Sequence, residues 1–590
     1  MNSLGANPNA QLPAPQFLVV FCVALAYCLP GLIGHQPWKP DEGYIFAGIF
    51  HMLQSGDWVV PHLAGEPFME KPPLYHWMGM VTASLTGTFL PTHDGARLAS
   101  GVFVGIALCA TALASRLAWG AGNGRIAVLV MLGTLGLLNT VPLMLPDLPL
   151  LAGFAVATLG LVAHAVGRKW AFLALGIGVG MGFLAKGLLA PGAMMIAAIA
   201  LPVCFVQWRE RRYAKFLLLA ALVALPWLTI WPTLLYARDS AAFTTWLWDN
   251  NIGRFLGFSV VTLGAASENG FWAKAFPWFV FPWWIFIAVC LWQTRARCLN
   301  EIGMQVGLTV ALSLSLVLVM AGSARVIYAL PIIPALALAT TGAFAQAPRR
   351  LWSILSVLGL IIATGIGLLS WFFCCALTYF GRTPDWQWIA RQVPVRFLLP
   401  ISPLNVLLGV ALCAGLVAIV RQAHRQNHGQ LLVWTASLAV AWALPTVLLM
   451  PWIDAAKGYR GVYESMALAL PSSYSCIVSE QLGESERGIL EYTQGIRTIR
   501  REVSPTASCP FLLRQIKSLQ AQSPSGEWVL LWSGARQSAG NERFQLFASD
   551  LFEEGRLQAE IWRRSAVALN ASPARPDSNL PYLDEVSNMD

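Results

Sequence analysis

The sequence predicts an all-α, polytopic membrane protein with a small α/β domain near its carboxyl end. Hydrophobic residues make up 56% of the 590 residues and charged residues only 12%, about half the share that is usual in soluble proteins. Charge-free runs long enough to cross roughly 30 Å of hydrocarbon recur along the chain. Polar residues become frequent only after about Asp454. This composition excludes a water-soluble globule of this length, because too few polar groups exist to cover its surface.

Thirteen apolar runs are expected to cross the bilayer as helices, because lipid offers no hydrogen-bond partner to an open strand edge. Residues 1–15 contain no basic segment, so the first run is expected to be an anchor and not a cleaved signal peptide. The shorter run 75–91 is rich in Thr, Ser and Gly and is expected to lie at the interface. If it spanned, the first loop would become cytoplasmic. The expected spans are 16–34, 98–118, 126–145, 148–167, 170–186, 188–207, 216–235, 275–293, 302–321, 327–346, 351–374, 400–420 and 431–451.

Lysine and arginine gather in alternate connections, which predicts the orientation of the chain by the positive-inside rule. With the amino terminus taken as cytoplasmic, the inside connections carry the basic groups, including the run from Arg209 to Lys215. The outer side then receives the first loop (35–97), the loop 236–274 and everything after residue 451. The net charge of +9 is therefore read as a topology signal. It is not a nucleic-acid footprint, since the basic residues are scattered over short turns.

The carboxyl-terminal part is expected to fold separately from the membrane domain, 1–453. Residues 454–566 are predicted to form a small outer α/β domain, followed by a disordered polar tail, 567–590. Short apolar runs predict strands, and other patterns in the domain predict helices. The expected strands lie around 476–478, 528–532 and 544–547, and the expected helices around 455–469 and 510–521.

Nine of the eleven cysteines lie in or beside expected spans, where buried thiols are common and inert. The other two, Cys476 and Cys509, fall in the carboxyl-terminal domain and could pair as a disulfide if that domain lies outside. No Cys/His spacing predicts a zinc site. Five histidines crowd the first loop without tight ligand spacing, so no metal or cofactor is expected to be required, and a divalent cation stays the alternative. These histidines are His35, His51, His62, His76 and His93.

Under this topology the unusual polar residues at the span ends all fall on the outer face. Ionisable groups beside hydrocarbon are costly, so such a gathering predicts a functional site. Carboxylates opposite cations suit a reaction that positions an acceptor and stabilises an anionic leaving group. The candidate residues are Asp41, Glu42 and Tyr44 after the first span, Glu70, Lys71 and Tyr75 in the same loop, Asp147 and Lys186 at span ends, Arg254 in the loop 236–274, and Arg325 and Tyr328 in a later turn.

The order of these motifs along residues 38–335 resembles one family. The motifs are Asp41-Glu42, Ser55-Gly56-Asp57-Trp58, Glu70-Lys71-Pro72-Pro73-Leu74, the lone Asp147, Leu184-Ala185-Lys186-Gly187, Asn251 with Arg254-Phe255, and Arg325 with Tyr328, Leu330 and Pro331. Their arrangement is similar to that of the bacterial aminoarabinose transferases of lipid A, within the protein O-mannosyltransferase-related GT-C glycosyltransferases. The Glu-Lys-Pro-Pro element marks the superfamily and says little about the sugar.

The resemblance implies a GT-C fold and an inverting glycosyltransferase of the bacterial inner membrane, with its site and its carboxyl-terminal domain facing the periplasm. The implied donor is a polyprenyl-phosphate sugar, of the undecaprenyl phosphate-aminoarabinose kind. The implied acceptor is lipid A or another glycolipid. Membrane lipids are the other partners, and no nucleic acid is involved.

The resemblance also implies roles for individual residues. Asp41 resembles the essential first-loop carboxylate, and Glu70 and Lys71 resemble a pair near the donor phosphate. Asp147 resembles a second acidic position, and Arg254 resembles the loop arginine. We therefore expect Asp41, Asp147 and Glu70 to be catalytic, Lys71, Arg254, Arg325 and Lys186 to bind the donor phosphate, and Glu42, Tyr44, Tyr75 and Tyr328 to contact donor or acceptor. Arg325 stands where relatives often carry lysine, and the two cations form hydrogen bonds in different geometries.

Other interpretations of the same residues stay open. Asp147 could cap the helix that follows it, Lys186 could extend to the lipid headgroups, and Asp57 could cap a short interfacial helix. The acceptor could instead be a protein hydroxyl or a cell-wall glycan. A rival of another class is a lipid or small-molecule transporter, which would place polar residues and broken helices near mid-span.

Overall fold

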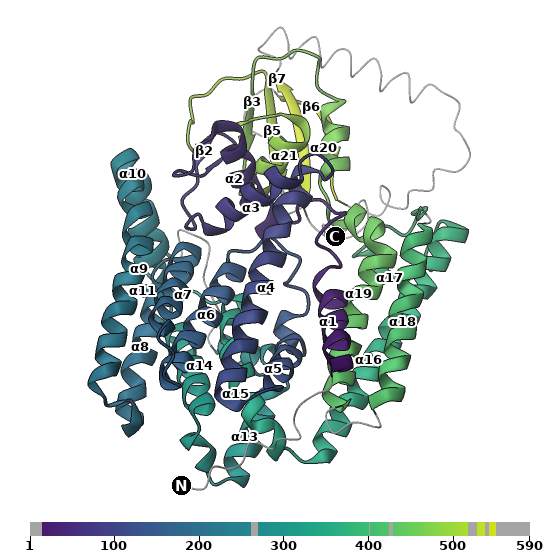
Figure 1. Ribbon diagram of the computed structural model, residues 1–590. Coiled ribbons are helices and arrows are strands. Elements are labelled where there is room, and N and C mark those ends of the chain that lie inside the picture. Colours follow the sequence, from purple (N-terminus) through teal and green to yellow (C-terminus); the bar gives the residue numbers. More distant parts are fainter. Residues whose placement is uncertain are drawn as a thin grey trace.

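The computed structural model describes residues 14–260, 270–400, 402–423, 429–516, 528–536 and 542–549. It shows a bundle of helices that is capped at one end by the first loop and by a small domain with a sheet (Figure 1). The predicted disordered tail, 567–590, lies outside the described residues. The architecture is the expected all-α membrane domain with an added α/β domain.

Eight described helices are long and apolar enough to cross a membrane, and a bent pair forms a ninth such segment. Four shorter apolar helices accompany them. By length the described helices support eight or nine of the expected thirteen spans, and the others stay a prediction. The long segments are α4 (Thr92–Trp119), α6 (Asp147–Ala165), α9 (Arg211–Arg238), α14 (Ile302–Met320), Val326–Ala343 with α15 (Ile333–Ala343), Arg349–Phe380 with α16 (Arg349–Cys375), α18 (Pro403–Ala423) and α19 (Gly429–Lys457). The shorter helices are α1 (Ala14–Cys28), α5 (Asn123–Leu132), α7 (Ala171–Lys186) and α8 (Leu189–Cys204).

Two expected spans are not continuous helices. The span expected at 126–145 ends as α5 at Leu132, and the chain then runs through short turns to Pro146. The span expected at 275–293 is divided into α12 (Phe271–Phe279) and α13 (Trp283–Gln293), which are bent by 86°. Proline and glycine account for both breaks, because they remove a backbone donor or favour turns.

The first loop is compact and contains two helices and a small hairpin. α2 (Asp41–Ser55) is followed by the antiparallel pair β1 (His62–Leu63) and β2 (Glu66–Pro67), and then by α3 (Leu74–Thr86). The 13 residues of α3 extend only about 20 Å, which is too short to cross the hydrocarbon core. Its length fits the interfacial placement expected for 75–91, and that placement stays a prediction.

Small residues bring α6 and α7 into close contact. A Cβ added at Gly178 would lie 2.4 Å from the backbone nitrogen of Ala157, and one added at Gly153 would lie 2.7 Å from the Gly178 carbonyl oxygen. Such small residues let membrane helices approach backbone to backbone. Since consecutive helices of this pair run in opposite directions, the start of α6 lies beside the end of α7. This places Asp147 against Lys186.

The carboxyl-terminal domain contains a five-stranded mixed sheet with strand order β4-β3-β5-β7-β6. β3 pairs in parallel with β4 and β5, and β7 pairs antiparallel with β5 and β6. The elements of the domain are α20 (Arg460–Ala467), β3 (Ile477–Glu480), α21 (Glu484–Gln494), β4 (Ile499–Arg500), β5 (Phe511–Ile516), β6 (Trp528–Gly534) and β7 (Arg543–Ser549).

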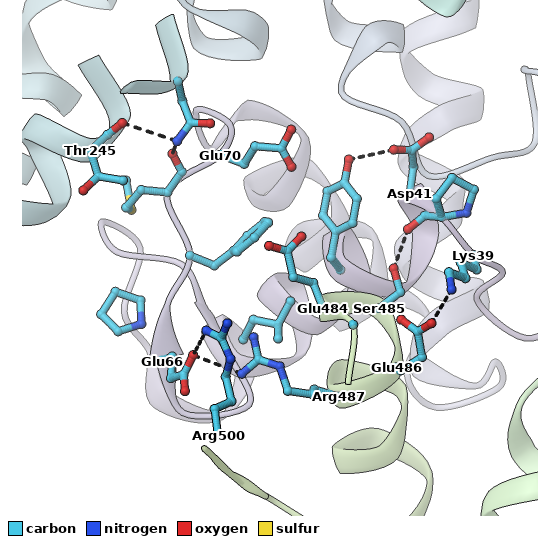
Figure 2. A pocket seen from close by; sticks show the side chains of 18 of the residues that line it. Lys39, Asp41, Glu66, Glu70, Thr245, Glu484, Ser485, Glu486, Arg487 and Arg500 are labelled. Carbon is cyan, nitrogen blue, oxygen red and sulfur yellow. Dashed lines mark hydrogen bonds and ion pairs between the residues drawn. The ribbon is translucent and has the colours of Figure 1, made fainter. Parts of the chain in front are cut away.

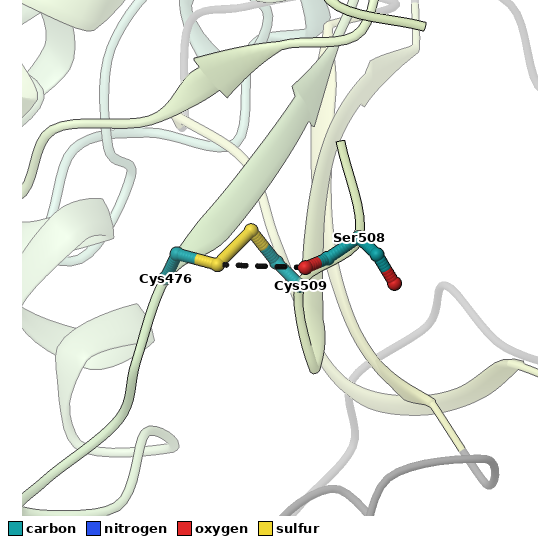
Figure 3. Close-up of a disulfide and its surroundings, with 3 residues drawn as sticks. All are labelled: Cys476, Ser508 and Cys509. Atoms are coloured by element: carbon teal, nitrogen blue, oxygen red, sulfur yellow. Dashed lines mark hydrogen bonds between the residues drawn. A yellow bond between two sulfur atoms is a disulfide. The ribbon is translucent and has the colours of Figure 1, made fainter. Parts of the chain in front are cut away.

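The three predicted strands are present, but the helix expected at 510–521 is wrong in its described part. Residues Phe511–Ile516 form β5, which pairs with β3 on one side and β7 on the other. A central strand is covered on both faces and reads as a continuous apolar run, so its sequence lacks the alternation of a half-exposed strand. A disulfide joins Cys476 to Cys509, with a Cα–Cα distance of 5.3 Å (Figure 3).

The carboxyl-terminal domain packs directly on the first loop through α21 and α2. A Cβ added at Gly43 would lie 2.6 Å from the Ser485 Cβ, and one added at Gly488 would lie 2.4 Å from the Ala47 Cβ. Ser485 also donates a hydrogen bond to the Pro40 carbonyl oxygen. The start of α2, where Asp41 lies, is therefore held against the start of α21.

Candidate functional site

A cavity of about 650 Å³ lies where the first loop, the Arg254 segment and the carboxyl-terminal domain meet (Figure 2). Its lining is dominated by charged side chains. Among the candidates from the sequence it includes Asp41, Tyr44, Glu70, Arg254 and Arg325. Elements that are distant in the sequence therefore bring these five residues to one place.

Asp41 is the first residue of α2 and faces the cavity. Its Oδ1 accepts a hydrogen bond of 2.8 Å from the Tyr44 hydroxyl, one helical turn later, and lies 3.5 Å from Nη1 of Arg325. Burial raises the pKa of Asp41, and the nearby carboxylate of Asp147 raises it further, against the lowering effects of the Tyr44 hydrogen bond and Arg325. Asp41 is thus a carboxylate whose pKa is shifted toward that of a useful proton acceptor.

Glu70 binds two cations with one oxygen. Its Oε1 lies 2.9 Å from Nζ of Lys71 and 2.8 Å from Nη1 of Arg254. Burial alone would raise the pKa of Glu70, but Lys71 and Arg254 outweigh it and lower the pKa to about 2. Arg254 begins α11 (Arg254–Leu256), directly after a π-helical stretch, Thr245–Gly253. The carboxylate therefore joins the first loop to the loop 236–274.

Asp147, Lys186 and Tyr328 form a second cluster beside the cavity. Nζ of Lys186 forms an ion pair with Oδ1 of Asp147 and lies 3.6 Å from the centre of the Tyr328 ring. Asp147 makes no capping hydrogen bond to the start of α6. Both side chains of the ion pair are buried, so the alternatives of a helix cap and of a lysine extended to the headgroups do not describe them.

Glu42 and Tyr75, which were expected to contact donor or acceptor, do not line the cavity. Glu42 is 2% exposed, and its carboxylate binds Arg97 at 2.9 Å and accepts backbone hydrogen bonds from Trp38 and Met144. Tyr75 is fully buried and bonds the Ser100 hydroxyl at 2.6 Å. The expected contact of these two side chains with donor or acceptor is therefore corrected, because packing turns both into the core of the first loop.

Asp57 and the histidines are the other polar residues of the first loop that the sequence singled out. Oδ1 of Asp57 accepts the backbone hydrogen bond of Val59 at 2.9 Å in a turn after α2. No helix follows this turn before α3, so the expected helix cap at Asp57 is wrong. Within the described ranges, no three His, Cys, Asp or Glu side chains form a group that could hold a metal ion.

The sequence interpretation missed the wall that the carboxyl-terminal domain contributes to the cavity. Arg487 and Arg500 each bind Oε2 of Glu66, a first-loop residue, at 3.0 Å. Glu484 and Glu486 of α21 also line the cavity. A charge-rich stretch, Gly483–Arg487, was visible in the sequence, but nothing in it indicated contact with the first loop. Arg97 was also missed, because nothing in the sequence indicated its contact with Glu42.

A family model supports the resemblance over part of the chain. Residues 70–235 match the family described as dolichyl-phosphate-mannose-protein mannosyltransferase. The chain is 28% identical over 294 residues to undecaprenyl phosphate-alpha-4-amino-4-deoxy-L-arabinose arabinosyl transferase 2 of Pseudomonas fluorescens, which covers 48% of this chain and 46% of the relative. It is 30% identical over 246 residues to the corresponding transferase of Pseudomonas paraeruginosa, which covers 41% and 44%. The match spans less than half the length of either relative.

Solved structures extend the likeness of fold to nearly the whole chain. ArnT from Cupriavidus metallidurans bound to undecaprenyl phosphate superposes with a TM-score of 0.67 at 14% sequence identity, covering 91% of this chain and 98% of that one. The apo form of the same protein gives 0.63 at 16%, covering 90% and 97%. The chain is therefore a polytopic membrane protein with the GT-C fold that these structures show.

Proposed function

We propose that the protein is a membrane glycosyltransferase that uses a polyprenyl-phosphate sugar of the undecaprenyl phosphate-aminoarabinose kind. The proposed acceptor is lipid A or another glycolipid, and the proposed location is the bacterial inner membrane, with the site facing the periplasm. The observation that carries the proposal is a cavity lined by Asp41, Glu70 and Arg254. Glu70 binds Lys71 and Arg254 through one oxygen. The names of the relatives supply the sugar and the carrier.

The cations are suited to a lipid-phosphate leaving group. Negative charge on the phosphate rises as the glycosidic bond breaks, and fixed cations at a poorly hydrated rim stabilise that charge more strongly than water does. Glu70 brings Lys71 and Arg254 to a single oxygen, so both cations face the same small volume. Arg325 also lines this cavity and lies 3.5 Å from Oδ1 of Asp41. Lys186 is held beside it by Asp147.

Asp41 is suited to the reacting sugar. Where the acceptor is a hydroxyl, a carboxylate of raised pKa accepts its proton as the bond to the anomeric carbon forms. Where the acceptor is a phosphate, it is already anionic, and Asp41 orients the donor sugar. In either case the acceptor attacks from the face opposite the leaving phosphate, which inverts the anomeric centre. The Tyr44 hydroxyl holds the carboxylate in place.

A lipid analysis tests the function. We expect total lipid A and glycolipids from cells with the gene to show a sugar-sized mass addition that is absent without it. The wild-type chain restores the addition, and Asp41→Asn does not, because the amide cannot accept the proton or pair with a cation. Asp385→Asn is the matched control, since Asp385 is exposed and distant from the cavity lining. Identical spectra in all strains would exclude lipid acceptors and favour a protein or cell-wall glycan acceptor.

A further inference from the structure

Five carboxylates line the cavity, and four of them already bind a cation or accept a hydrogen bond from another side chain. Asp41 has Tyr44 and Arg325, and Glu70 has Lys71 and Arg254. The remaining three are labelled in Figure 2. They are Glu66, which binds Arg487 and Arg500; Glu486, which binds Lys39 and accepts a hydrogen bond of 2.9 Å from Gln515; and Glu484.

Glu484 differs from the others because its carboxylate has no hydrogen bond or ion pair to any residue in the described part of the chain. It is the first residue of α21, where the helix dipole favours a negative charge. Glu484 is exposed toward the open cavity. Partial desolvation still raises its pKa, and the charge of Glu70 adds to this effect, whereas Arg487 and Arg500 lower it. The carboxylate thus faces the cavity without a direct partner.

The neighbours of Glu484 in α21 fix its position relative to Asp41. Ser485 donates its hydroxyl to the Pro40 carbonyl oxygen, and Glu486 pairs with Lys39. Both contacts fall directly before Asp41, and the close approach of Gly43 to Ser485 continues them along α2. Glu484 and Asp41 therefore lie at the same contact between α21 and α2, although 443 positions separate them in the sequence.

We propose that Glu484 binds the ammonium group of an amino sugar on the donor and so selects amino sugars over neutral ones. The inference rests on the proposed function and names a residue that determines its specificity. A carboxylate facing a cavity without a cation is complementary to a ligand that brings one, and an ammonium-carboxylate hydrogen bond is charge-assisted and directional. The sugar in the names of the relatives carries such an amino group.

The test compares two donors with the purified full-length chain in lipid nanodiscs. One donor is undecaprenyl phosphate-4-amino-4-deoxy-L-arabinose, and the other carries L-arabinose, with a hydroxyl in place of the ammonium group. For Glu484→Gln, kcat/KM with the amino donor is expected to fall at least about tenfold, the size of one hydrogen bond to a charged group, mainly through KM. With the neutral donor it is expected to stay unchanged. The preference of the wild type for the amino donor is therefore expected to disappear.

Two further variants make the outcome specific. Glu484→Asp keeps the charge and is expected to retain part of the preference, whereas Glu464→Gln, an exposed change on α20, is expected to retain all of it. Equal losses with both donors in Glu484→Gln, or no loss, would overturn the inference and leave the proposed function standing. A wild-type chain that transfers neither sugar to any lipid acceptor would overturn the proposed function itself.

Discussion

The carboxylate of Glu70 holds two cations of the candidate site together. Its oxygen Oε1 joins Lys71, its sequence neighbour, to Arg254, which lies 184 positions away. Removing the carboxylate would leave two partly buried cations close together with no counter-charge, which is costly in a poorly hydrated setting. Glu70 therefore has a structural role in holding the cations as well as its expected role in the reaction.

The charge state of Glu70 predicts how stability depends on pH. Its folded-state pKa of about 2 lies below the unfolded value of about 4.3, so the ionised group stabilises the fold above about pH 4.5. That contribution disappears as the pH falls toward 2. Glu70→Gln is expected to lower the free energy of unfolding by about 3 kcal/mol at pH 7, and by progressively less below pH 4.

Denaturation of the detergent-solubilised proteins at several pH values measures this difference. Glu464→Gln is the matched control, since that side chain is exposed and lies outside the cavity. A difference between wild type and Glu70→Gln that stayed constant from pH 7 to pH 3 would show that the ion pairs with Lys71 and Arg254 do not stabilise the fold.

At the scale of elements, the contact between α6 and α7 decides where the ion pair of Asp147 and Lys186 lies. The two charges stand at the start of one helix and the end of the next, so any change in the separation of the helices moves one charge relative to the other. The glycines of α7 permit the close approach. Their spacing in the sequence is visible, but the sequence does not say which neighbour they face.

Gly178→Ala is expected to force these helices apart. The added methyl group would meet backbone atoms of Ala157 and Gly153, which cannot rotate away as a side chain can. Overpacking of this kind costs about 1–3 kcal/mol. Gly192→Ala in α8 is the matched control, because a Cβ there meets nothing within 4 Å. Thermal unfolding in detergent is the measurement, and equal midpoints for the two variants would contradict the close contact.

At the scale of the whole molecule, the first loop and the carboxyl-terminal domain meet at one end of the bundle (Figure 1), and Arg254 lines the cavity that they share. α9 has 28 residues and is therefore about 40 Å long. Its last residue, Arg238, contacts Asp57 of the first loop at 3.2 Å. Its basic start, at Arg211, consequently lies at the opposite end of the bundle, as the positive-inside rule predicts for a cytoplasmic connection.

This geometry predicts the outcome of topology fusions. Alkaline phosphatase joined after residue 460 is expected to be active, because that position lies on the side of the first loop and is proposed to face the periplasm. The same enzyme joined after residue 210 is expected to be inactive. Enzyme activity, normalised to the amount of fusion protein, is the measurement. An inactive but stably expressed fusion at 460 would reverse the proposed orientation.

The amino-acid sequence by itself determined the membrane class, most of the spans, three of the strands and five of the residues that line the cavity. These features follow from composition, hydropathy and short motifs, which are local properties of a chain. Only the tertiary structure decided that Glu42 and Tyr75 turn into the core, that Phe511–Ile516 is a strand, and that α21 closes the cavity with Glu484. The physical reason is that a buried side chain takes its partner from whatever element packs against it, and in this protein those partners lie up to several hundred residues away.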